Sequence, residues 1–258
     1  MRVWHMSGAG NDFAVLDVRG ISTDLAQLAI DLCQHTGSDG MMAVDTAKDA
    51  DFRLHFYNSD GLRGEMCGNG SRCICRFAYE NGIAGSAMTV LTDAGPIQGW
   101  RLSESQYRIK LNDPGVLDLH RKAGVAYVEL GRPGIPHAVV ELPGLTFSHK
   151  EQLRNKAVSL RHDPLFPKGA NINFYTRLAE GQVRILTYER GVEDYTQACG
   201  TGSASVAVVL HALGQLPGGR LTVQNEGGTL HICLKEAQGR ITALYLEGPT
   251  EILNIFDL

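Results

Sequence analysis

Apolar and polar residues alternate along several short segments of this chain, as they do in strands with one buried face. The alternating segments are residues 53–57, 106–111, 183–188 and 240–246. Two continuous apolar runs, residues 13–16 and 138–140, predict strands that are buried more deeply. In residues 23–35 the apolar side chains recur at helical spacing, after Ser22 or Thr23 as a cap. The pattern therefore predicts an α/β (α+β) protein.

Two further helices are predicted over residues 71–79 and 203–213, and each follows a glycine-rich turn that contains a cysteine. The first turn reads CGNGS from Cys67, and the second reads CGTGS from Cys199. Both helices are short and rather apolar, and glycines at positions 82 and 214 mark their ends. We expect each to be a central helix, surrounded by strands of its own half of the chain.

The two cysteine turns belong to a longer internal repeat. Cys67 and Cys199 lie 132 residues apart, and other matches, such as Tyr57 with Tyr188, keep nearly this offset. An offset of about half the chain indicates a duplicated domain and not an array of short repeats. Pro and Gly at positions 114 and 115 mark the boundary, which predicts domains at residues 1–113 and 114–258. Each domain holds one of these cysteines, and the last residues are candidates to return to the first domain.

Composition narrows the classes of function. The 258 residues are 43% hydrophobic and 20% charged, with a net charge of −4 and no basic stripe, so we expect no nucleic-acid partner. The N-terminus does not look like a signal peptide, and no apolar run is long enough to span a membrane. We therefore expect a cytoplasmic protein without a membrane partner. The six cysteines include no C-x-x-C pair, which disfavours structural disulfides and a metal site.

The cysteine turns suggest a chemistry. A helix N-terminus exposes unpaired N–H groups and partial positive charge, and glycines let a ligand approach that backbone. The same field lowers the pKa of a thiol, to roughly 3.5–7.5 in favourable sites. Two such thiols on opposite sides of a substrate would act as one base and one acid, moving a proton from one face of a carbon to the other. The alternative is an inert buried thiol, which is our interpretation of Cys33, Cys73, Cys75 and Cys233.

Besides the cysteine turns, the sequence contains GAGNDF from Gly8, NSDG from Asn58, Pro-His at 136–137, ANI from Ala170 and ERG from Glu189. With these motifs the chain resembles, from end to end, the diaminopimelate epimerase family. The resemblance implies a cofactor-independent isomerase that interconverts LL- and meso-2,6-diaminopimelate, on the route to lysine and peptidoglycan. It also implies two similar domains, each a strand-rich, barrel-like layer around a central helix, with the active site in the cleft between them. A homodimer remains open as the state of assembly.

The resemblance also assigns roles to individual residues. Cys67 and Cys199 would be the acid–base pair, and Glu189 and His137 would lie beside the reacting end of the substrate and tune it. The substrate-binding residues form two sets: Gly68, Asn69, Gly200 and Thr201 would hold the reacting carboxylate, and Asn11, Asn58, Asn171, Arg190 and Glu189 would line the rest of the pocket. These residue types suit a zwitterion, because an arginine can pair with a carboxylate and an amide both donates and accepts.

Three departures from the family pattern bear on the substrate. Ile135 stands where the family usually has Asn, the loop of residues 191–198 is one residue longer than its commonest form, and Gly40 replaces a Gln. An alternative is a two-cysteine racemase of another amino acid, such as histidine. Proline-racemase-like enzymes usually carry His at the place of Asn69. A thiol redox protein is a further alternative, which the lack of a nearby resolving cysteine disfavours.

Overall fold

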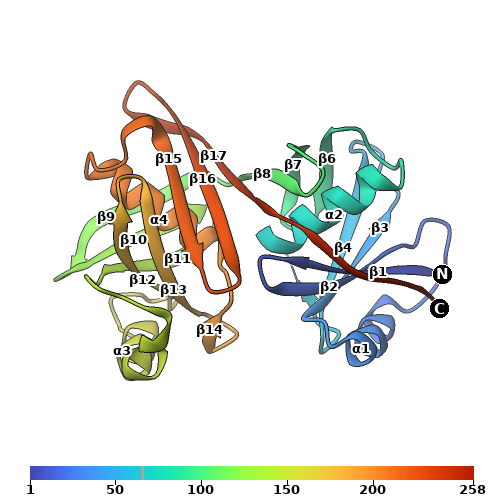
Figure 1. The fold of residues 1–258 in the computed structure, drawn as a ribbon, viewed down its shortest axis with the longest axis horizontal. Coiled ribbons are helices and arrows are strands. Elements are labelled where there is room, and N and C mark those ends of the chain that lie inside the picture. The colour runs from blue at the N-terminus through green and yellow to red at the C-terminus, as the bar shows by residue number, and fades with distance from the viewer. Residues whose placement is uncertain (65–66) are drawn as a thin grey trace. The chain divides into compact units, whose positions relative to one another are not determined.

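The computed structural model describes residues 1–64 and 67–258, which form two compact units. Unit 1 consists of residues 1–110 and 247–258, and unit 2 consists of residues 111–246 (Figure 1). The fold is a strand-rich mixture of α and β structure, with four α-helices in the described ranges. This confirms the α/β class that the sequence predicts. Every helix in these ranges is too short to cross a lipid bilayer.

The elements of unit 1 are β1 (Arg2–Gly8), β2 (Asn11–Asp17), α1 (Leu25–Thr36), β3 (Gly40–Asp45), β4 (Phe52–Asn58), β5 (Arg63–Gly64), α2 (Gly68–Glu80), β6 (Ala87–Thr92), β7 (Gly95–Arg101), β8 (Gln106–Leu111) and β18 (Glu251–Asp257). Those of unit 2 are β9 (Pro114–Lys122), β10 (Val125–Gly131), β11 (Gly134–Glu141), the 3-10 helix η1 (Phe147–His149), α3 (Lys150–Arg161), β12 (Asn171–Ala179), β13 (Gln182–Glu189), β14 (Asp194–Thr196), α4 (Gly200–Ala212), the 3-10 helix η2 (Pro217–Gly219), β15 (Arg220–Asn225), β16 (Gly228–Ala237) and β17 (Arg240–Pro249).

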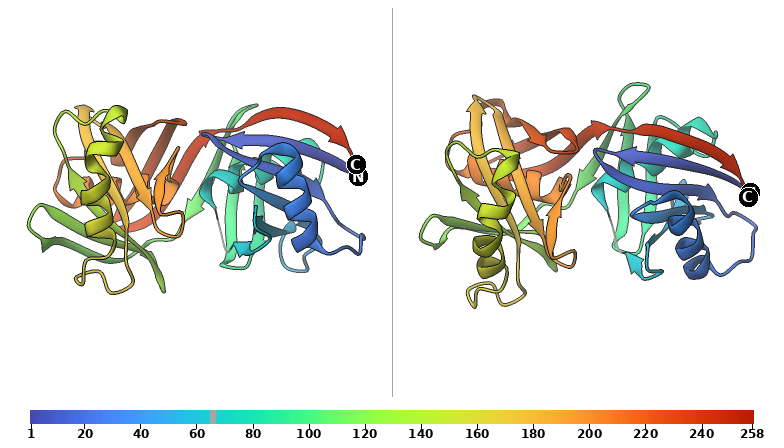
Figure 2. Two further views of the ribbon diagram at one scale, coloured as in Figure 1. Left: turned by 90° about the horizontal axis from the view of Figure 1, so that it is seen from below. Right: turned by 60° about the horizontal axis from the view of Figure 1, so that its bottom comes forward.

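The strands of unit 1 pair in one continuous series. β18, β1 and β2 are antiparallel neighbours, β2 is parallel to β3, and β3 is antiparallel to β4. β4 is parallel to β6, which continues antiparallel through β7 to β8. A two-residue turn at Ala9 and Gly10, both with positive φ, joins β1 to β2 and makes Asn11 the first residue of β2. Figure 2 shows β18 beside β1, with the two chain ends together.

Unit 2 has the same order of pairings. β9, β10 and β11 are antiparallel neighbours, β11 is parallel to β12, and β12 is antiparallel to β13. β13 is parallel to β15, which is antiparallel to β16. Tyr57 and Tyr188 hold the same place in the two series. From that register Met42 of unit 1 corresponds to Asn173 of unit 2, and Phe13 corresponds to His137.

A buried helix forms the core of each unit. α2 packs against β1, β2, β3 and β7, and α4 packs against β10, β11, β12, β15 and β16. α1 lies on the outer side of unit 1, against β2, β3 and β4 (Figure 1). β3 is therefore covered on both faces: Met41 and Ala43 belong to the core beneath α1, whereas Met42 touches α2. This double cover explains why a continuous apolar run, and not an alternating one, forms the strand.

The helix boundaries differ from the predicted ones for local reasons. Both central helices begin three residues early, at Gly68 and Gly200, because the glycines that suggested a turn belong to the first helical turn. α1 begins at Leu25, since the cap is Asp24, which accepts hydrogen bonds from two helical N–H groups. The sequence pattern did not predict α3. This helix is polar on most of its surface and buries only two side chains, so its apolar periodicity is weak.

Candidate active site

Cys67 and Cys199 occupy the same local position, the cap of a central helix. Cys67 caps α2 with φ −126° and ψ 120°, and Cys199 caps α4 with φ −120° and ψ 110°. The carbonyl of each accepts a helical hydrogen bond, from the N–H of Ser71 at 2.8 Å and from that of Ser203 at 2.9 Å. Each thiol therefore lies at a helix N-terminus, whose partial positive charge favours the thiolate.

The second glycine of each cysteine turn packs closely against a strand. A Cβ on Gly70 would lie 1.7 Å from Cε of Met42, and a Cβ on Gly202 would lie 2.2 Å from Oδ1 of Asn173. Met42 and Asn173 occupy equivalent positions of β3 and β12. Equivalent strands thus support the two turns, but the supporting side chain is apolar in unit 1 and polar in unit 2.

In unit 1 the structure brings together two predicted site residues, Asn11 and Asn69. Nδ2 of Asn69 donates to Oδ1 of Asn11 at 2.5 Å, and Nδ2 of Asn11 donates to Oδ2 of Asp39 at 3.1 Å. Arg72 holds the same turn from the other side. Its Nη2 donates to Oδ1 of Asn69 and its Nη1 donates to the carbonyl of Gly68, both at 3.1 Å. The first turn of α2 is thus tied both to β2 and to its own second turn.

Arg72 itself was given no role by the sequence analysis. Its side chain is completely buried, and its Nε has no hydrogen-bond partner. Burial lowers the pKa of Arg72 to about 10, so the guanidinium still carries its charge at neutral pH. The sequence carries no signal that separates Arg72 from Arg76, the other arginine of the same helix.

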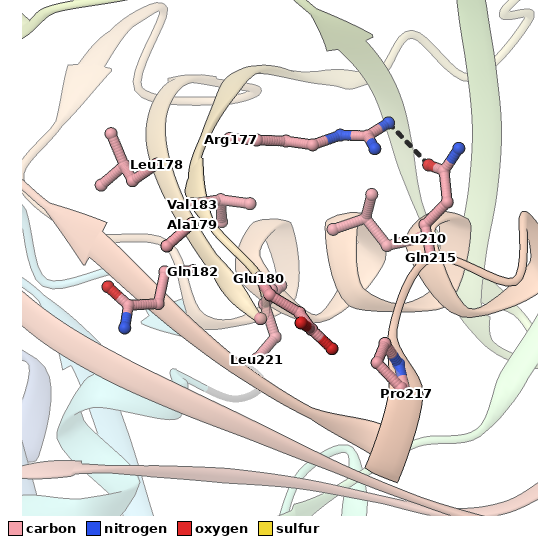
Figure 3. Close-up of a pocket in the computed structure, with 11 residues that line it drawn as sticks. Arg177, Leu178, Ala179, Glu180, Gln182, Val183, Leu210, Gln215, Pro217 and Leu221 are labelled. Atoms are coloured by element: carbon pink, nitrogen blue, oxygen red, sulfur yellow. Dashed lines mark hydrogen bonds between the residues drawn. The ribbon is translucent and has the colours of Figure 1, made fainter.

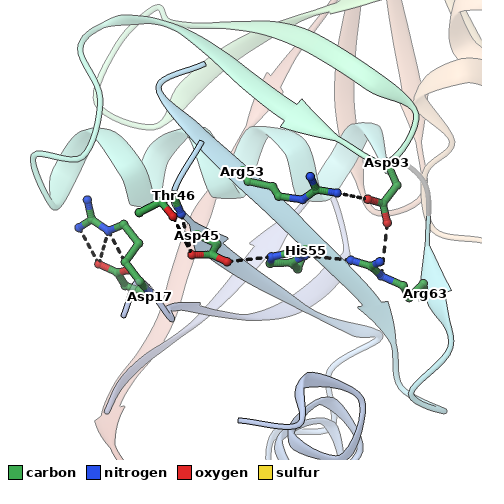
Figure 4. A network of polar contacts seen from close by, with 8 residues as sticks. Asp17, Asp45, Thr46, Arg53, His55, Arg63 and Asp93 are labelled. Atoms are coloured by element: carbon green, nitrogen blue, oxygen red, sulfur yellow. Dashed lines mark hydrogen bonds and ion pairs between the residues drawn. The ribbon is translucent and has the colours of Figure 1, made fainter. Parts of the chain in front are cut away.

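Asn58 lies outside that bonded group. It is the last residue of β4 and is exposed, and a tight turn leads from it to β5. Polar contacts cover the outer surface of these two strands (Figure 4). Arg63 donates to Nδ1 of His55 at 2.9 Å and pairs with Asp93 at 3.3 Å, and Arg53 pairs with the same carboxylate at 2.9 Å. These groups are partly exposed, and the network holds the last described strand before the cysteine turn.

In unit 2 the structure brings Cys199 together with Glu189. The Glu189 carboxylate accepts hydrogen bonds from the Cys199 thiol and from Oγ1 of Thr196, the latter at 2.9 Å. Burial raises the pKa of Glu189, and the two hydrogen bonds act in the opposite direction. Sγ of Cys199 also accepts from the N–H of Gly202 at 3.3 Å and lies 3.5 Å from Oγ1 of Thr201. The thiol therefore lies between a backbone donor and a carboxylate acceptor.

His137 is completely buried, and a second polar network fixes its tautomer. Its Nδ1 lies 3.2 Å from Nδ2 of Asn173. The Asn173 amide cannot turn over, because Nδ2 also faces two backbone carbonyls while Oδ1 accepts from Oγ1 of Thr187 at 3.0 Å. Nδ1 of His137 is thus the acceptor, and the proton of the neutral ring is on Nε2.

Burial, and secondarily the charge of Arg190, lowers the pKa of His137 to about 3. The ring is therefore neutral at physiological pH and serves as a hydrogen-bond donor, not as a cation. Its buried Nε2 has no partner among the described residues. An N–H donor of this kind suits a ligand carboxylate.

Asn171 positions Arg190. Oδ1 of Asn171 accepts from the N–H of Arg190 at 2.9 Å, and Nδ2 donates to the carbonyl of Pro136 at 3.1 Å. Both ends of this amide are therefore engaged within the protein. The Arg190 side chain is exposed, and its Nη1 donates to the carbonyl of Lys168 at 3.1 Å, which leaves other donors of the guanidinium for a ligand.

The predicted site residues thus fall into two groups, one in each unit. The first comprises Asn11, Asn58, Cys67, Gly68 and Asn69, and the second comprises His137, Asn171, Glu189, Arg190, Cys199, Gly200 and Thr201. Three residues outside the predicted set bind side chains of these groups, namely Arg72, Asn173 and Thr196. Asn173 carried a signal, because it follows Asn171 by two residues and so lies on the same face of one strand.

Other features of the structure do not form part of this site. A surface cavity of about 460 Å³ lies in unit 2 between the β12–β13 hairpin and the end of α4, and Arg177 and Gln215 meet at its rim (Figure 3). It contains none of the predicted site residues. Among residues 1–64 and 67–258, no three His, Cys, Asp or Glu side chains are arranged to hold a metal ion, and no disulfide joins the described cysteines.

Comparison with known families and curated proteins gives a consistent match. A family model described as diaminopimelate epimerase matches residues 3–106 and 132–253. A diaminopimelate epimerase of Chlorobaculum tepidum is 34% identical over 252 residues, which cover 95% of this chain and 96% of the relative. That of Flavobacterium psychrophilum is 30% identical and covers 98% of both chains. That of Aquifex aeolicus is 34% identical over 83% of this chain and 82% of its own.

Solved structures of similar fold are more distant in sequence. A phenazine biosynthesis protein of the PhzF family from Bacillus anthracis matches with a TM-score of 0.72 and 14% identity, over 100% of this chain and 98% of its own. A hydroxyproline epimerase from Agrobacterium vitis, solved with trans-4-hydroxy-L-proline, matches with a TM-score of 0.68 and 17% identity, over 100% and 90%. At such identities the likeness is one of fold alone.

Proposed function

This chain belongs to the diaminopimelate epimerase family, and on that premise we propose that it interconverts LL- and meso-2,6-diaminopimelate without a cofactor. The observation that carries the proposal is the matched pair of thiols, each capping a buried helix with nearly the same backbone geometry. The reaction inverts one α-carbon, so a proton has to leave one face of that carbon and return to the other. Two thiols in equivalent positions are suited to this exchange of roles.

In the proposed reaction, one cysteine acts as a thiolate and takes the α-proton. The other acts as a thiol, delivers its proton to the opposite face and becomes a thiolate. Between these steps the electron pair of the broken C–H bond is shared between the α-carbon and the reacting carboxylate. Backbone N–H groups of the two helical first turns, at Gly68–Asn69 and Gly200–Thr201, would stabilise that charge. One thiolate and one thiol are present before and after the reaction. Only protons are exchanged, so the reaction needs no oxidant or reductant.

Glu189 and His137 complete the reacting end in this proposal. Glu189 contacts the Cys199 thiol and can hold its proton in place. His137 is a neutral donor through Nε2, which suits the substrate carboxylate, and with a pKa of about 3 the ring is too weak a base to compete for the α-proton.

The far end of the substrate carries a second carboxylate and an ammonium group. Arg190 is exposed and offers charge-assisted hydrogen bonds to that carboxylate. Asn171 places the backbone of Arg190, and Asn11 and Asn58 offer amides for the ammonium group. Because Ile135 has no polar side chain, the proposal makes Arg190 the main determinant for a substrate with two carboxylates.

We also propose that the chain consists of two similar domains from an internal duplication, residues 1–113 and 114–258 by sequence. Each would be a strand-rich, barrel-like layer around its central helix. The equal order of strand pairings and the constant offset of the repeat support this. Two-base chemistry needs a thiol on each face of one carbon, so the proposal places the substrate in a cleft between the domains. The family resemblance motivates a cytoplasmic location and a homodimer as further parts of the proposal.

The test is a solvent-deuterium assay over a panel of amino acids, followed by chiral analysis. We expect α-deuterium and interconversion for LL- and meso-diaminopimelate. Cys67→Ala and Cys199→Ala should each abolish epimerisation, because each removes the proton carrier on one face, whereas the control Cys233→Ala should stay active.

Near-normal epimerisation by either of the first two variants would overturn the two-thiol mechanism. If the enzyme leaves diaminopimelate untouched but racemises histidine or another monocarboxylate, the substrate is wrong and the chemistry alone remains.

A further inference from the structure

Arg72 is a buried cation that the mechanism above does not use. Its two hydrogen-bond acceptors, the Gly68 carbonyl and the Asn69 amide oxygen, are uncharged, and its Nε is unpartnered. No carboxylate in the described part of the chain forms an ion pair with it. A buried charge without a counter-ion is costly, so this position favours a negative charge close by.

Three thiols act electrostatically on Arg72, namely Cys73, Cys67 and Cys75. Burial raises the pKa of Cys73 and of Cys75 to about 12, so both are neutral at physiological pH. Cys67 is only partly buried, and the N–H groups of the α2 N-terminus also favour its thiolate. Of the three, Cys67 is therefore the group suited to carry the negative charge.

The other charged groups around this turn do not supply the negative charge beside Arg72. Asp12 on β2 and Arg76 on α2 both act on Cys73. Asp12 lies 3.8 Å from the imidazole of His5 and is partly exposed, and Arg76 is paired with Glu80. Arg76 carries the same sign of charge as Arg72, and Asp12 is engaged by His5, so neither takes the place of a Cys67 thiolate.

The second thiol also lies at a helix N-terminus, where its sulfur accepts a hydrogen bond from the N–H of Gly202, but the charged residue beside it is different. Ala204 follows Cys199 by five residues, as Arg72 follows Cys67, so α4 has no cation at that place. Cys199 instead contacts the half-buried carboxylate of Glu189. A carboxylate beside a thiol disfavours the thiolate by like-charge repulsion.

From this contrast we propose that Arg72 is a positioning residue that holds Cys67 as the thiolate, so that Cys67 is the base and Cys199 the acid of the free enzyme. The inference rests on the proposed two-thiol function and adds its resting charge state. Sγ of Cys67 takes the α-proton and becomes S–H, while S–H of Cys199 gives its proton to the opposite face and becomes S⁻. A thiolate beside Arg72 is favoured over one beside Glu189, so proton exchange with solvent returns the free enzyme to the first state.

The test measures the two thiols without substrate. Iodoacetamide alkylates thiolates, and peptide mass spectrometry follows each cysteine separately as a function of pH. The pH midpoint of alkylation, unlike the absolute rate, does not depend on how accessible the sulfur is. In the wild type we expect a lower midpoint for Cys67 than for Cys199.

Two substitutions separate the charge of Arg72 from its hydrogen bonds. Arg72→Gln keeps a donor for the Gly68 carbonyl but removes the charge, and should raise the Cys67 midpoint by at least about one pH unit, which is a tenfold change in the ionisation constant of the thiol. The Cys199 midpoint should not move. Arg72→Lys keeps the charge and should restore most of the Cys67 reactivity. In turnover, Arg72→Gln should lower kcat more than it changes KM.

The matched control is Arg76→Gln, one turn further along the same helix, which should leave the Cys67 midpoint unchanged. Circular dichroism establishes that each variant is folded. A folded Arg72→Gln protein with an unaltered Cys67 profile would overturn the proposal. So would a wild-type protein in which Cys199 has the lower midpoint, a result that needs no variant. If the Arg72 effect appears but diaminopimelate is not epimerised, the proposed function fails and the charge assignment stands.

Discussion

Cys67 and Cys199 share a backbone position, but the residues behind their turns differ in chemistry. Behind the first are Phe13 and Met42, and behind the second are His137 and Asn173 at the equivalent positions. The polar pair is fully buried; the Asn173 amide has its hydrogen bonds, whereas Nε2 of His137 has no partner among the described residues. Because the buried His137 ring is neutral, the free energy of unfolding should decrease at low pH.

His137 should make folding stability depend on pH. Its pKa is about 3 in the folded protein and 6.5 in the unfolded chain, so between these values the unfolded state binds more protons. Stability should then fall as the pH falls from 6.5, by up to about 1.4 kcal/mol per unit, with no contribution above that range. His137→Phe, which introduces the residue found at the equivalent place of unit 1, should remove this slope. Urea unfolding at several pH values measures it, and an equal slope in both proteins would contradict the buried neutral ring.

Arg190 should decide between substrates with one and two carboxylates. Arg190→Met removes the charge but keeps an apolar side chain, and should lower kcat/KM for diaminopimelate by about tenfold or more, since a hydrogen bond to a charged group is worth about 1.5–3 kcal/mol. Arg177→Met, at the rim of the separate cavity, is the control and should have little effect. Steady-state assays measure both variants. Equal activity of Arg190→Met and wild type would show that Arg190 does not bind the distal carboxylate.

At the scale of elements, the first turns of α2 and α4 can lie close to their strands only because glycine has no side chain. The two helices pack against different side chains. Gly70 faces the flexible thioether of Met42, and Gly202 faces the hydrogen-bonded amide of Asn173. A flexible side chain can move away from an added methyl group, whereas an amide held on both sides cannot.

Gly202→Ala should therefore destabilise the protein more than Gly70→Ala. Overpacking costs about 1–3 kcal/mol, and the higher helix propensity of alanine returns up to about 1 kcal/mol at either site. We expect a net loss near 2 kcal/mol for Gly202→Ala and a small one for Gly70→Ala. Each variant is the control of the other in chemical denaturation. Equal losses would show that the Asn173 amide yields as easily as Met42.

At the scale of the whole molecule, the C-terminal strand completes the sheet of the N-terminal unit. β18 pairs with β1 from Arg2 opposite Asp257 to Ser7 opposite Glu251, and Phe256 packs against the core beneath α1. Unit 1 is therefore built from the two ends of the chain, whereas unit 2 is continuous in sequence.

Deletion of residues 251–258 should destabilise unit 1 selectively. The deletion leaves the edge of β1 unpaired and exposes apolar surface, so amide hydrogen exchange in β1 and β2 should become faster while β12 and β13 in unit 2 keep their protection. Deletion of residue 258 alone, outside the strand, is the control. Hydrogen-exchange mass spectrometry reports both units in one experiment. Loss of protection in β12 and β13 to the same extent would mean that the two units unfold together.

The sequence by itself determined the α/β class, the two central helices and the position of both thiols before a helix. These features depend on local patterns: the alternation of apolar residues reflects a half-buried strand, and a cysteine followed by glycines marks a helix start. The two sets of site residues were predicted from the family resemblance, which rests on short motifs such as ERG and GAGNDF.

Only the tertiary structure decided the surroundings of those motifs. Arg72 reads as an ordinary helix residue until strands from other parts of unit 1 bury it without a carboxylate. The tautomer of His137 follows from the Asn173 amide, which lies on another strand and is itself held by Thr187 on a third. The pairing of β18 with β1 joins residues about 250 positions apart. Burial, charge compensation and strand partners are set by residues distant in sequence, and no local pattern can contain them.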